Sequence, residues 1–500
     1  MSTGDTETGA EPDSAEDTTR RTFLKGATAA AAGGSTLLAG CTGTGDGGGS
    51  DGGDGGDGGD GGDGGDGGDG GGSTPSTPPG EGAVHFISME QAPPFQNYWD
   101  KTASQFEEEN GTSVEVTYAW DTGYNKRIAE LIQAGNPPDI INLEGWNVGQ
   151  YVLDELLADV TGIWSDFQNE FGAPDSYRIQ YNDADRWFPS FVAPNVRWYR
   201  GDIMSDLGYE GSGGPIDDYQ PPATFDEFQE YVGMVDESDD HDVRGTALGT
   251  GATLYGTNTM FADIWGRGGR ISKWVDDEVQ VGLGDYRDMV TSHLEWKKAT
   301  YEYSPNTANW SWTEAIDAFA NGNVGEAFYG GARMQIQSFR RDRPWAKEVF
   351  CGPYMNDPDT DNGQDYSFPS GWGVMQGGSQ TEAAKEYISM IMMDEELLDE
   401  FYQKAPVHNA PLDEERADPS HPVWDVELVN EAMTEAQLQF YLDQIPKGAA
   451  SFYDTEPPNY RVSPMFTSLG LGNMAFEYII NDSSADDAID TAISEMEGAL

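Results

Sequence analysis

The spacing of hydrophobic residues predicts alternating strands and helices from residue 83 onward. Residues 83–88 form a short apolar run and residues 114–120 alternate in polarity, which predicts two strands. Residues 139–143 are a further apolar run of the kind found in buried strands. Between the strands, hydrophobic residues recur at helical spacing at Phe95, Tyr98, Trp99, Thr102 and Phe106, and again at Ile128, Leu131, Ile132 and Ala134. This order predicts a parallel sheet with helices packed on its faces.

Capping residues mark the starts of two later helices. Thr224 precedes Phe225 and Asp226, so that Glu227 stands at the capping-box position. Ser484, with Asp487 three residues on, predicts the start of the last helix. The inward residues of that last helix are expected to be Ala485, Ile489, Ala492, Ile493 and Met496.

The first 41 residues have the features of an export signal. Arg20 and Arg21 precede a short Ala- and Gly-rich apolar run, which is typical of a twin-arginine (Tat) signal. The run is shorter than the about 20 residues that a transmembrane helix needs. The sequence Leu-Ala-Gly-Cys ending at Cys41 resembles a lipobox, which predicts lipidation of Cys41. Residues 42–82 include seven consecutive Asp-Gly-Gly units at 51–71 and are predicted to form a disordered tether, because such a segment cannot bury an apolar core.

Composition bounds the chemistry of the remaining body. The chain has 88 acidic and 27 basic residues and a formal net charge of -61, which argues against nucleic-acid binding because phosphates require Lys and Arg. Molar salt shortens the Debye length to about 3 Å, so this charge indicates adaptation to a hypersaline habitat. Cys41 and Cys351 are the only cysteines, and no CxxC, HExxH or His-rich cluster occurs. We therefore expect no disulfide framework, no metal site and no cofactor.

Six segments spread along the body carry the motifs of a known family in the family's order. The run IAELIQAGNPPDIINLEGW (128–146) has a turn with the sequence Gly-Asn-Pro-Pro-Asp, followed by a hydrophobic strand. The other segments are residues 188–204, 221–232, 318–331, 370–396 and 405–415. Together they cover essentially the whole body, and they resemble family 1 extracellular solute-binding proteins of ABC importers, in the maltose- and oligosaccharide-binding cluster.

The resemblance implies an α/β fold of the periplasmic-binding-protein-like type II class, with two lobes, a hinge and a ligand cleft between the lobes. Chain crossings between the lobes are expected near residues 193–196, 350–356 and 405–411. Lobe one would then comprise residues 83–194 and 353–406. Lobe two would comprise residues 195–352 and 407–500.

Aromatic and polar residues at the ends of the predicted strands are candidate solute contacts. Sugars present C–H faces to aromatic rings and hydroxyl groups to carboxylates and amides. In parallel sheets, ligands bind beyond the carboxyl ends of the strands. The residues at these ends are Glu90, Trp120, Asp121, Glu144 and Trp146.

The resemblance adds candidates at the hinge and in the second lobe, namely Asn195, Tyr255, Asn258, Trp310, Tyr329 and His408. Of the two tryptophans beside Ser311, one is expected to pack at a helix start and the other to face the cleft. The strongest aromatic candidate is Trp372, because Gly371 and Gly373 on either side have no side chains to bury its ring; the alternative is a core residue in a strand. The visible arginines near the proposed cleft are Arg197 and Arg333.

These features favour a non-enzymatic receptor that delivers a sugar or oligosaccharide to an ABC permease. It would be exported by the Tat pathway, anchored by lipid on the outer face of the membrane, and monomeric. A receptor of the same fold for a polyamine or glycerol phosphate is the alternative, and a sensor would use the same lobes with a different partner. A glycoside-acting enzyme would need two carboxylates about 5–9 Å apart. The enzyme is disfavoured because no nucleophile elbow, Ser-His-Asp order or metal motif occurs.

Overall fold

The computed structural model describes residues 80, 82–90, 93–119, 122–357, 365–404, 411–413, 415–455 and 457–500. Several residues that the sequence analysis singled out lie outside these ranges and receive no structural account: Cys41, Trp120, Asp121 and His408.

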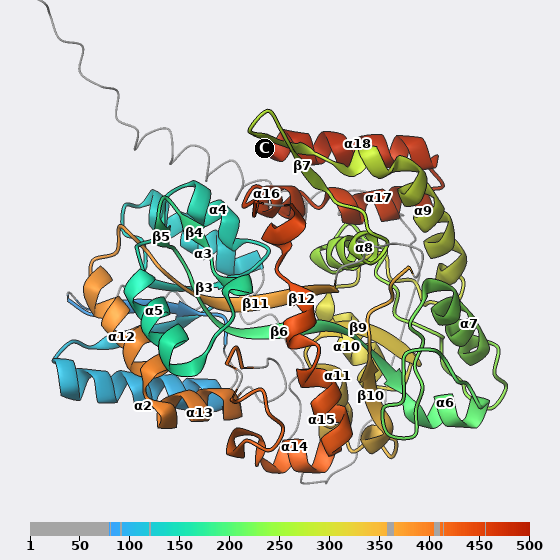
Figure 1. Cartoon of the computed structure of the whole chain (residues 1–500), viewed down its shortest axis with the longest axis horizontal. Coiled ribbons are helices and arrows are strands. Elements are labelled where there is room, and N and C mark those ends of the chain that lie inside the picture. Colours follow the sequence, from blue (N-terminus) through green and yellow to red (C-terminus); the bar gives the residue numbers. More distant parts are fainter. Residues whose placement is uncertain are drawn as a thin grey trace, which may run out of the picture.

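A mixed sheet of eight strands runs through the middle of the molecule (Figure 1). Its strands are β1 (Val84–Ser88), β2 (Val114–Tyr118), β3 (Ile140–Glu144), β6 (Phe188–Arg200), β9 (Glu326–Gly330), β10 (Val349–Gly352), β11 (Asp365–Val374) and β12 (Gly448–Ala449). The main path has the order β10-β6-β11-β3-β1-β2, while β9 pairs with β6 and β12 pairs with β11. Two small hairpins are formed by β4 (Gln180–Tyr181) with β5 (Ala184–Asp185), and by β7 (Ser272–Val275) with β8 (Glu278–Val281).

The predicted parallel unit is confirmed, because β1 pairs in parallel with both β2 and β3. The strand β11, by contrast, runs antiparallel to β3 and to β6. Helix α2 (Pro93–Asn110) buries the same five residues that the periodicity predicts, Phe95, Tyr98, Trp99, Thr102 and Phe106. The sequence-predicted α/β class therefore holds, with an antiparallel strand inserted beside the parallel ones.

The remaining α-helices pack around the sheet. They are α3 (Thr122–Gln133), α4 (Val148–Leu153), α5 (Thr161–Phe171), α6 (Gly201–Leu207), α7 (Phe225–Asp236), α8 (Leu254–Gly266), α9 (Arg287–Tyr301), α10 (Trp312–Ala320), α11 (Arg333–Arg340), α12 (Thr381–Met393), α13 (Glu395–Lys404), α14 (Glu427–Ala432), α15 (Glu435–Leu442), α16 (Val462–Thr467), α17 (Gly470–Ile479) and α18 (Ala485–Ala499). Short 3-10 turns include η5 (Ile445–Lys447) and η6 (Ser451–Asp454).

Two groups of elements form two lobes, which lie at opposite ends of the sheet in Figure 1. Lobe one contains β1, β2 and β3 with α2, α5, α12 and α13 around them. Lobe two contains β9 and β10 with α6 to α11. The long strand β6 joins them, since its residues up to Pro194 pair with β11 and its residues from Asn195 pair with β9. This change of partner lies within the crossing expected near residues 193–196.

The C-terminal part of the chain contacts both lobes. Ser451 Oγ donates to the carbonyl oxygen of Gly145 in lobe one at 3.1 Å. Three residues later, Asp454 accepts hydrogen bonds from Trp265 Nε1 at 2.6 Å and from the Ser272 backbone N at 2.7 Å, both in lobe two. The segment around η6 is therefore a further connection between the lobes, which the sequence did not predict.

Both predicted helix caps are present. Thr224 accepts from the Glu227 backbone N, and the Glu227 side chain accepts in return from the Thr224 backbone, so α7 begins with a complete capping box. Ser484 accepts from the Asp487 backbone N at the start of α18. Each cap satisfies backbone donors that have no partner within the helix.

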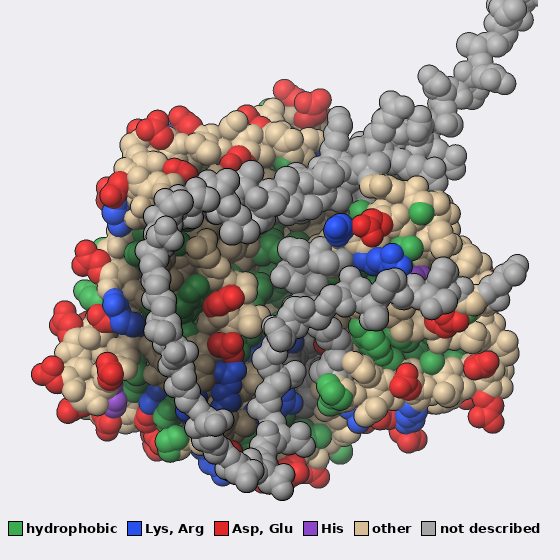
Figure 2. All heavy atoms as spheres, turned by 180° about the vertical axis from the view of Figure 1, so that it is seen from behind, with side chains coloured by type: hydrophobic (Ala, Val, Ile, Leu, Met, Phe, Trp, Pro, Cys, Tyr) green, Lys and Arg blue, Asp and Glu red, His purple; other side chains and the backbone are tan. Residues whose placement is uncertain are grey.

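Acidic side chains are spread over the face of the molecule that Figure 2 shows. Figure 2 shows Asp and Glu side chains scattered over one face of the molecule rather than gathered in a single patch. Within the described residues, none of the helices combines the length and apolar character needed to cross a membrane.

Candidate functional site

Side chains from the two lobes converge where the parallel strands end. Glu90 follows β1 and Glu144 ends β3, both in lobe one. From lobe two, Tyr329 lies near the end of β9, and Arg333 begins α11. Burial raises the pKa values of both glutamates and of Tyr329, and the charge of Arg333 opposes each of these increases. The four side chains therefore lie within electrostatic range of one another. We call them the interlobe cluster.

Glu144 is the most perturbed acid of the cluster. Burial, with a smaller contribution from the neighbouring Glu90, raises the pKa of its carboxyl to about 7, against the opposing effects of Ser370 and Arg333. Ser370 Oγ donates to Glu144 Oε2, and β11 holds Ser370 opposite Glu144 in the ladder with β3. Burial also raises the pKa of Glu90, with Arg333 again opposing the shift. Of the two acids, Glu144 is thus poised to carry a proton near neutral pH.

Lobe two supplies the cation and an aromatic ring. The Arg333 guanidinium lies 6.0 Å from the centroid of the Tyr329 ring. Between them, Gly331 has φ of +100°, a backbone conformation that glycine adopts far more readily than other residues. This turn carries the chain from β9 into α11 and brings both side chains to the interlobe cluster.

A wall of half-buried aromatic rings borders the cluster. The rings of Trp312 and Tyr329 meet edge to face at a centroid distance of 5.6 Å. Trp312 also contacts Phe368 of β11 at 6.1 Å. In lobe one, Trp146 stacks on Phe466 of α16 at 6.1 Å. Phe466 is buried, but the rings of the other four residues are only partly buried, so their exposed edges and faces can contact a ligand.

The buried side-chain amides of Asn195 and Asn258 lie near the lobe connection. Neither has a hydrogen-bond partner among the described residues. Asn195 lies on β6 opposite Gly330, and its Oδ1 would be 3.3 Å from a Cβ placed on that glycine. Asn258 lies on α8, three residues after Tyr255. An unpaired buried amide costs roughly 1–3 kcal/mol. Polar partners from a solute or from water would remove that cost.

Tyr255 supports the aromatic wall from behind. Its side chain is buried, its hydroxyl donates to the Ala247 carbonyl at 2.7 Å, and its ring meets Trp312 edge to face at 4.9 Å. The structure therefore places Tyr255 behind Trp312, as a residue that orients the wall.

The structure corrects the expectation for Trp372, whose side chain is 1% exposed. Its ring packs edge to face against Trp99 of α2 at 5.9 Å and contacts Phe401 of α13 at 5.4 Å, inside the core of lobe one. Glycine is required beside it because the backbones pack closely: a Cβ on Gly371 would lie 2.1 Å from the Phe188 carbonyl oxygen. We therefore leave Trp372 out of the candidate site.

The two arginines that the sequence places near the site have different surroundings. Arg333 joins the interlobe cluster, whereas Arg197 is buried in lobe two and pairs with Glu326 at 2.9 Å. The tryptophans beside Ser311 also differ. Trp312 carries the ring that contacts Tyr329, while Trp310 is half-buried and has no such ring contact among the described residues. The sequence analysis names Trp310 as the candidate solute contact, whereas the ring that lies beside Tyr329 is that of Trp312.

The described residues contain a surface pocket separate from the cluster and no group placed to hold a metal ion. Across the described ranges, no group of three or more His, Cys, Asp or Glu side chains is placed to hold a metal ion. An open surface pocket shares no residue with the cluster and is lined by Asp175, Arg178, Gln180, Tyr453, Pro457, Pro458 and Tyr460.

Two α/β lobes joined by crossing strands, with polar and aromatic side chains converging between them, are an arrangement suited to binding a small molecule between the lobes. Residues 88–395 match the family of bacterial extracellular solute-binding proteins, and the chain belongs to this family. A search of the curated proteins found no match.

Solved structures show the same fold at low sequence identity. An ABC transporter solute-binding protein from Thermotoga lettingae, bound with α-D-tagatose, superposes with a TM-score of 0.66 at 14% identity, covering 83% of this chain and 99% of that one. The maltose-bound MalE3 protein of T. maritima gives a TM-score of 0.62 at 17% identity, with 84% and 100% covered. A solute-binding protein from Agrobacterium radiobacter K84, in complex with ribitol, gives 0.66 at 14% identity, with 84% and 98% covered.

Proposed function

We propose that this protein is a lipid-anchored receptor outside the cell membrane that binds a neutral sugar or polyol and delivers it to an ABC import permease. The observation that carries the proposal is the interlobe cluster, in which Arg333 of lobe two faces Glu90 and Glu144 of lobe one beside half-buried aromatic rings. Carboxylates and a guanidinium bond hydroxyl groups, and rings such as those of Trp146, Trp312 and Tyr329 pack against the C–H faces of a sugar.

The charge of the cluster favours a neutral solute. Arg333 offsets the charge of one acid, and the raised pKa of Glu144 favours its neutral form, so the cluster carries little net charge. A cationic solute would have to compete with Arg333 for Glu90, and an anionic solute would face two acids. Solved proteins of the same fold bound with tagatose, maltose and ribitol agree with this chemistry.

The proposed binding step is closure of the two lobes over the solute. We propose the lobe boundaries stated from the sequence, 83–194 with 353–406 and 195–352 with 407–500. Because the cluster draws its residues from both lobes, a solute bound to it contacts both and stabilises the closed arrangement. The permease would then recognise the closed receptor. Tat export, lipidation of Cys41 and the acidic tether 42–82 would keep the receptor close to its permease.

A tryptophan fluorescence titration tests the proposal. The protein is titrated in about 3 M KCl, since molar salt shortens the Debye length to about 3 Å. Tagatose, ribitol, maltose and a longer maltodextrin are compared with spermidine and glycerol phosphate. We expect a saturable change with at least one neutral sugar or polyol. A response to spermidine or glycerol phosphate alone would overturn the neutral-solute assignment, and release of product from a glycoside would favour an enzyme.

A further inference from the structure

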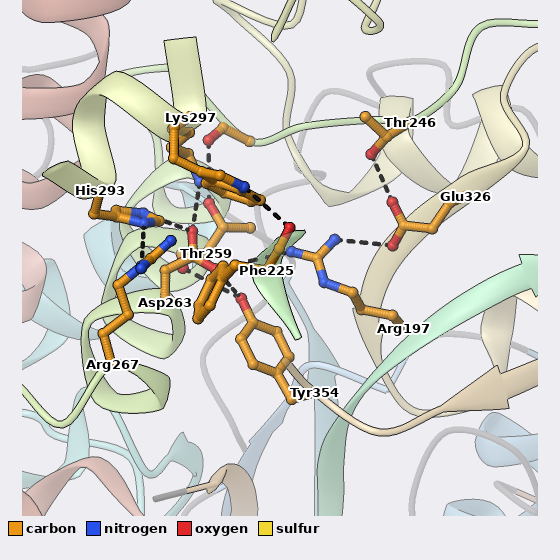
Figure 3. Close-up of polar contacts among 12 residues, drawn as sticks. Arg197, Phe225, Thr246, Thr259, Asp263, Arg267, His293, Lys297, Glu326 and Tyr354 are labelled. Carbon is orange, nitrogen blue, oxygen red and sulfur yellow. Dashed lines mark hydrogen bonds and ion pairs between the residues drawn. The ribbon is translucent and has the colours of Figure 1, made fainter. Parts of the chain in front are cut away.

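Two of the chain segments that connect the lobes approach a single buried carboxylate, that of Asp263 on α8 (Figure 3). Arg197 lies on β6, the first connecting strand, with its Nη2 atom 3.8 Å from Asp263 Oδ1. Tyr354 follows β10 on the way to β11, and its hydroxyl donates to the same Oδ1 atom at 2.6 Å. All three side chains are buried.

The rest of the Asp263 environment comes from α9. Lys297 Nζ donates to Asp263 Oδ2 at 2.7 Å, and His293 Nε2 lies 3.2 Å from the same oxygen. Burial by itself raises the pKa of Asp263, but Lys297, His293 and Arg197 together hold it well below its usual range. Asp263 is therefore an ionised group whose partners come from three separate parts of the chain, namely β6, the segment after β10 and α9.

Additional contacts fix each connecting segment to lobe two. On the first segment, the Arg197 guanidinium also donates to Glu326 of β9 at 2.9 Å. On the second, the backbone N of Asp357 donates to the Gly266 carbonyl at 3.0 Å, at the end of α8. Arg267, the next residue, has its Nη1 atom 3.9 Å from Asp357 Oδ2.

We propose that Asp263, Arg197 and Tyr354 form a hinge clamp that ties both connecting segments to α8 and so sets the resting angle between the lobes. Separating buried charged partners leaves an uncompensated charge in a low-dielectric interior, which is strongly unfavourable. Bending therefore takes place on the lobe-one side of the clamp. On β6 this leaves the residues before Arg197, around Pro194 and Asn195, where the strand changes partners.

The clamp also positions groups of the candidate site. Asn195, with its unpaired amide, lies two residues before Arg197 on β6. Tyr255 and Asn258 lie on α8, the helix that carries Asp263. Arg197 and Tyr354 are thus positioning residues that act through the backbone of β6 and the orientation of α8.

The test measures the angle between the lobes without any solute. Spin labels are placed on the full chain at E108C in α2 and D288C in α9, two exposed positions in different lobes. Cys41→Ser removes one native thiol, and Cys351 is buried. Pulsed electron resonance then gives the distribution of label distances. We expect Tyr354→Phe, which removes one hydroxyl and keeps the ring, to widen that distribution at least twofold, and Asp263→Asn to widen it as well.

Tyr209→Phe is the matched control, because the Tyr209 hydroxyl donates to the Glu227 carbonyl at 3.0 Å in lobe two, away from the connecting segments. Thermal unfolding confirms that each variant is folded at the temperature of measurement. The proposal is overturned if Tyr354→Phe leaves the distribution as narrow as Tyr209→Phe does, or if both widen it equally. The measurement needs no solute, so its outcome is independent of the proposed sugar specificity.

Discussion

At Glu144, a carboxyl that ends a strand is held partly out of water beside a second acid. Its raised pKa means that the folded protein binds this proton more tightly than the unfolded chain does. Stability contributed by the protonated form is therefore lost as pH rises from the ordinary glutamate range through about 7. Above that pH, the folded protein bears a desolvated charge.

We predict that Glu144→Gln stabilises the protein at high pH. The shift corresponds to about 3 kcal/mol at about 1.4 kcal/mol per pKa unit. The gain in unfolding free energy, measured with urea, should be far larger at about pH 8 than at about pH 4.5. Glu108→Gln, at an exposed position of α2, is the control. An equal effect of Glu144→Gln at both pH values would show that the carboxyl does not titrate in this range.

Trp312 tests the aromatic wall. Its indole ring contacts Tyr329 and Phe368, and replacement by phenylalanine keeps an aromatic side chain while reducing the surface offered to a solute. We predict that Trp312→Phe weakens solute binding by about 1 kcal/mol, roughly fivefold in Kd. Calorimetric titration with the sugar that responds in fluorescence measures the change.

The matched control for Trp312 is Trp274, an exposed tryptophan (39%) on the β7–β8 hairpin. Trp274→Phe should leave Kd unchanged. If both substitutions weaken binding equally, or neither does, Trp312 is not a solute contact.

At the scale of elements, the contact between α8 and α9 contains a histidine that resists protonation. Burial lowers the pKa of His293 to about 4, Arg267 and Lys297 lower it as well, and Asp263 opposes them. Arg267 Nε donates to His293 Nδ1 at 3.0 Å, which requires that this nitrogen carry no proton. Protonation would break that bond and add a cation beside Arg267 and Lys297.

We predict that the free energy of unfolding falls as the pH is lowered from about 6.5 to about 4. The unfolded chain takes up the histidine proton at about pH 6.5 and the folded protein does not, so unfolding becomes easier as pH falls, by about 3 kcal/mol over the whole range. His293→Gln should flatten this pH dependence in urea unfolding, and His241→Gln is the control. The flattening is partial because burial lowers the pKa of His85 too. An unchanged slope in His293→Gln would rule out this histidine as a cause.

At the scale of the whole molecule, net charge governs the response to salt. A formal charge of -61 repels itself over about 30 Å in about 0.01 M salt and over about 3 Å in about 1 M salt. We predict that the midpoint of thermal unfolding rises steadily from dilute buffer to molar KCl. Calorimetry measures this, with sucrose at matched osmolality as the uncharged control. A midpoint that is highest in dilute buffer would contradict the hypersaline interpretation.

Local order was well determined by the sequence alone. The inward residues of α2 and the capping box at Thr224 and Glu227 follow from patterns within a few residues. The parallel pairing of β1 follows from the alternation of strands and helices along the chain. Such patterns work because backbone hydrogen bonding and burial of one helix face depend on neighbours close in the chain. Similarity along the whole body then indicated the family, and with it the two-lobed fold.

Tertiary structure decided which of the candidate residues meet between the lobes. Trp372 looks accessible beside its glycines, yet α2 and α13, which are distant in sequence, cover it. Arg197 and Arg333 are equally basic, but only the chain path of β6 and the turn at Gly331 send one to the core and the other to the interlobe cluster. Glu90 and Glu144 are neighbours because β1 and β3 pair in parallel, so that their carboxyl ends lie at the same edge of the sheet. Whether a polar or aromatic side chain faces a ligand depends on what packs against its other side, and that is fixed by contacts between segments that lie far beyond the reach of local sequence patterns.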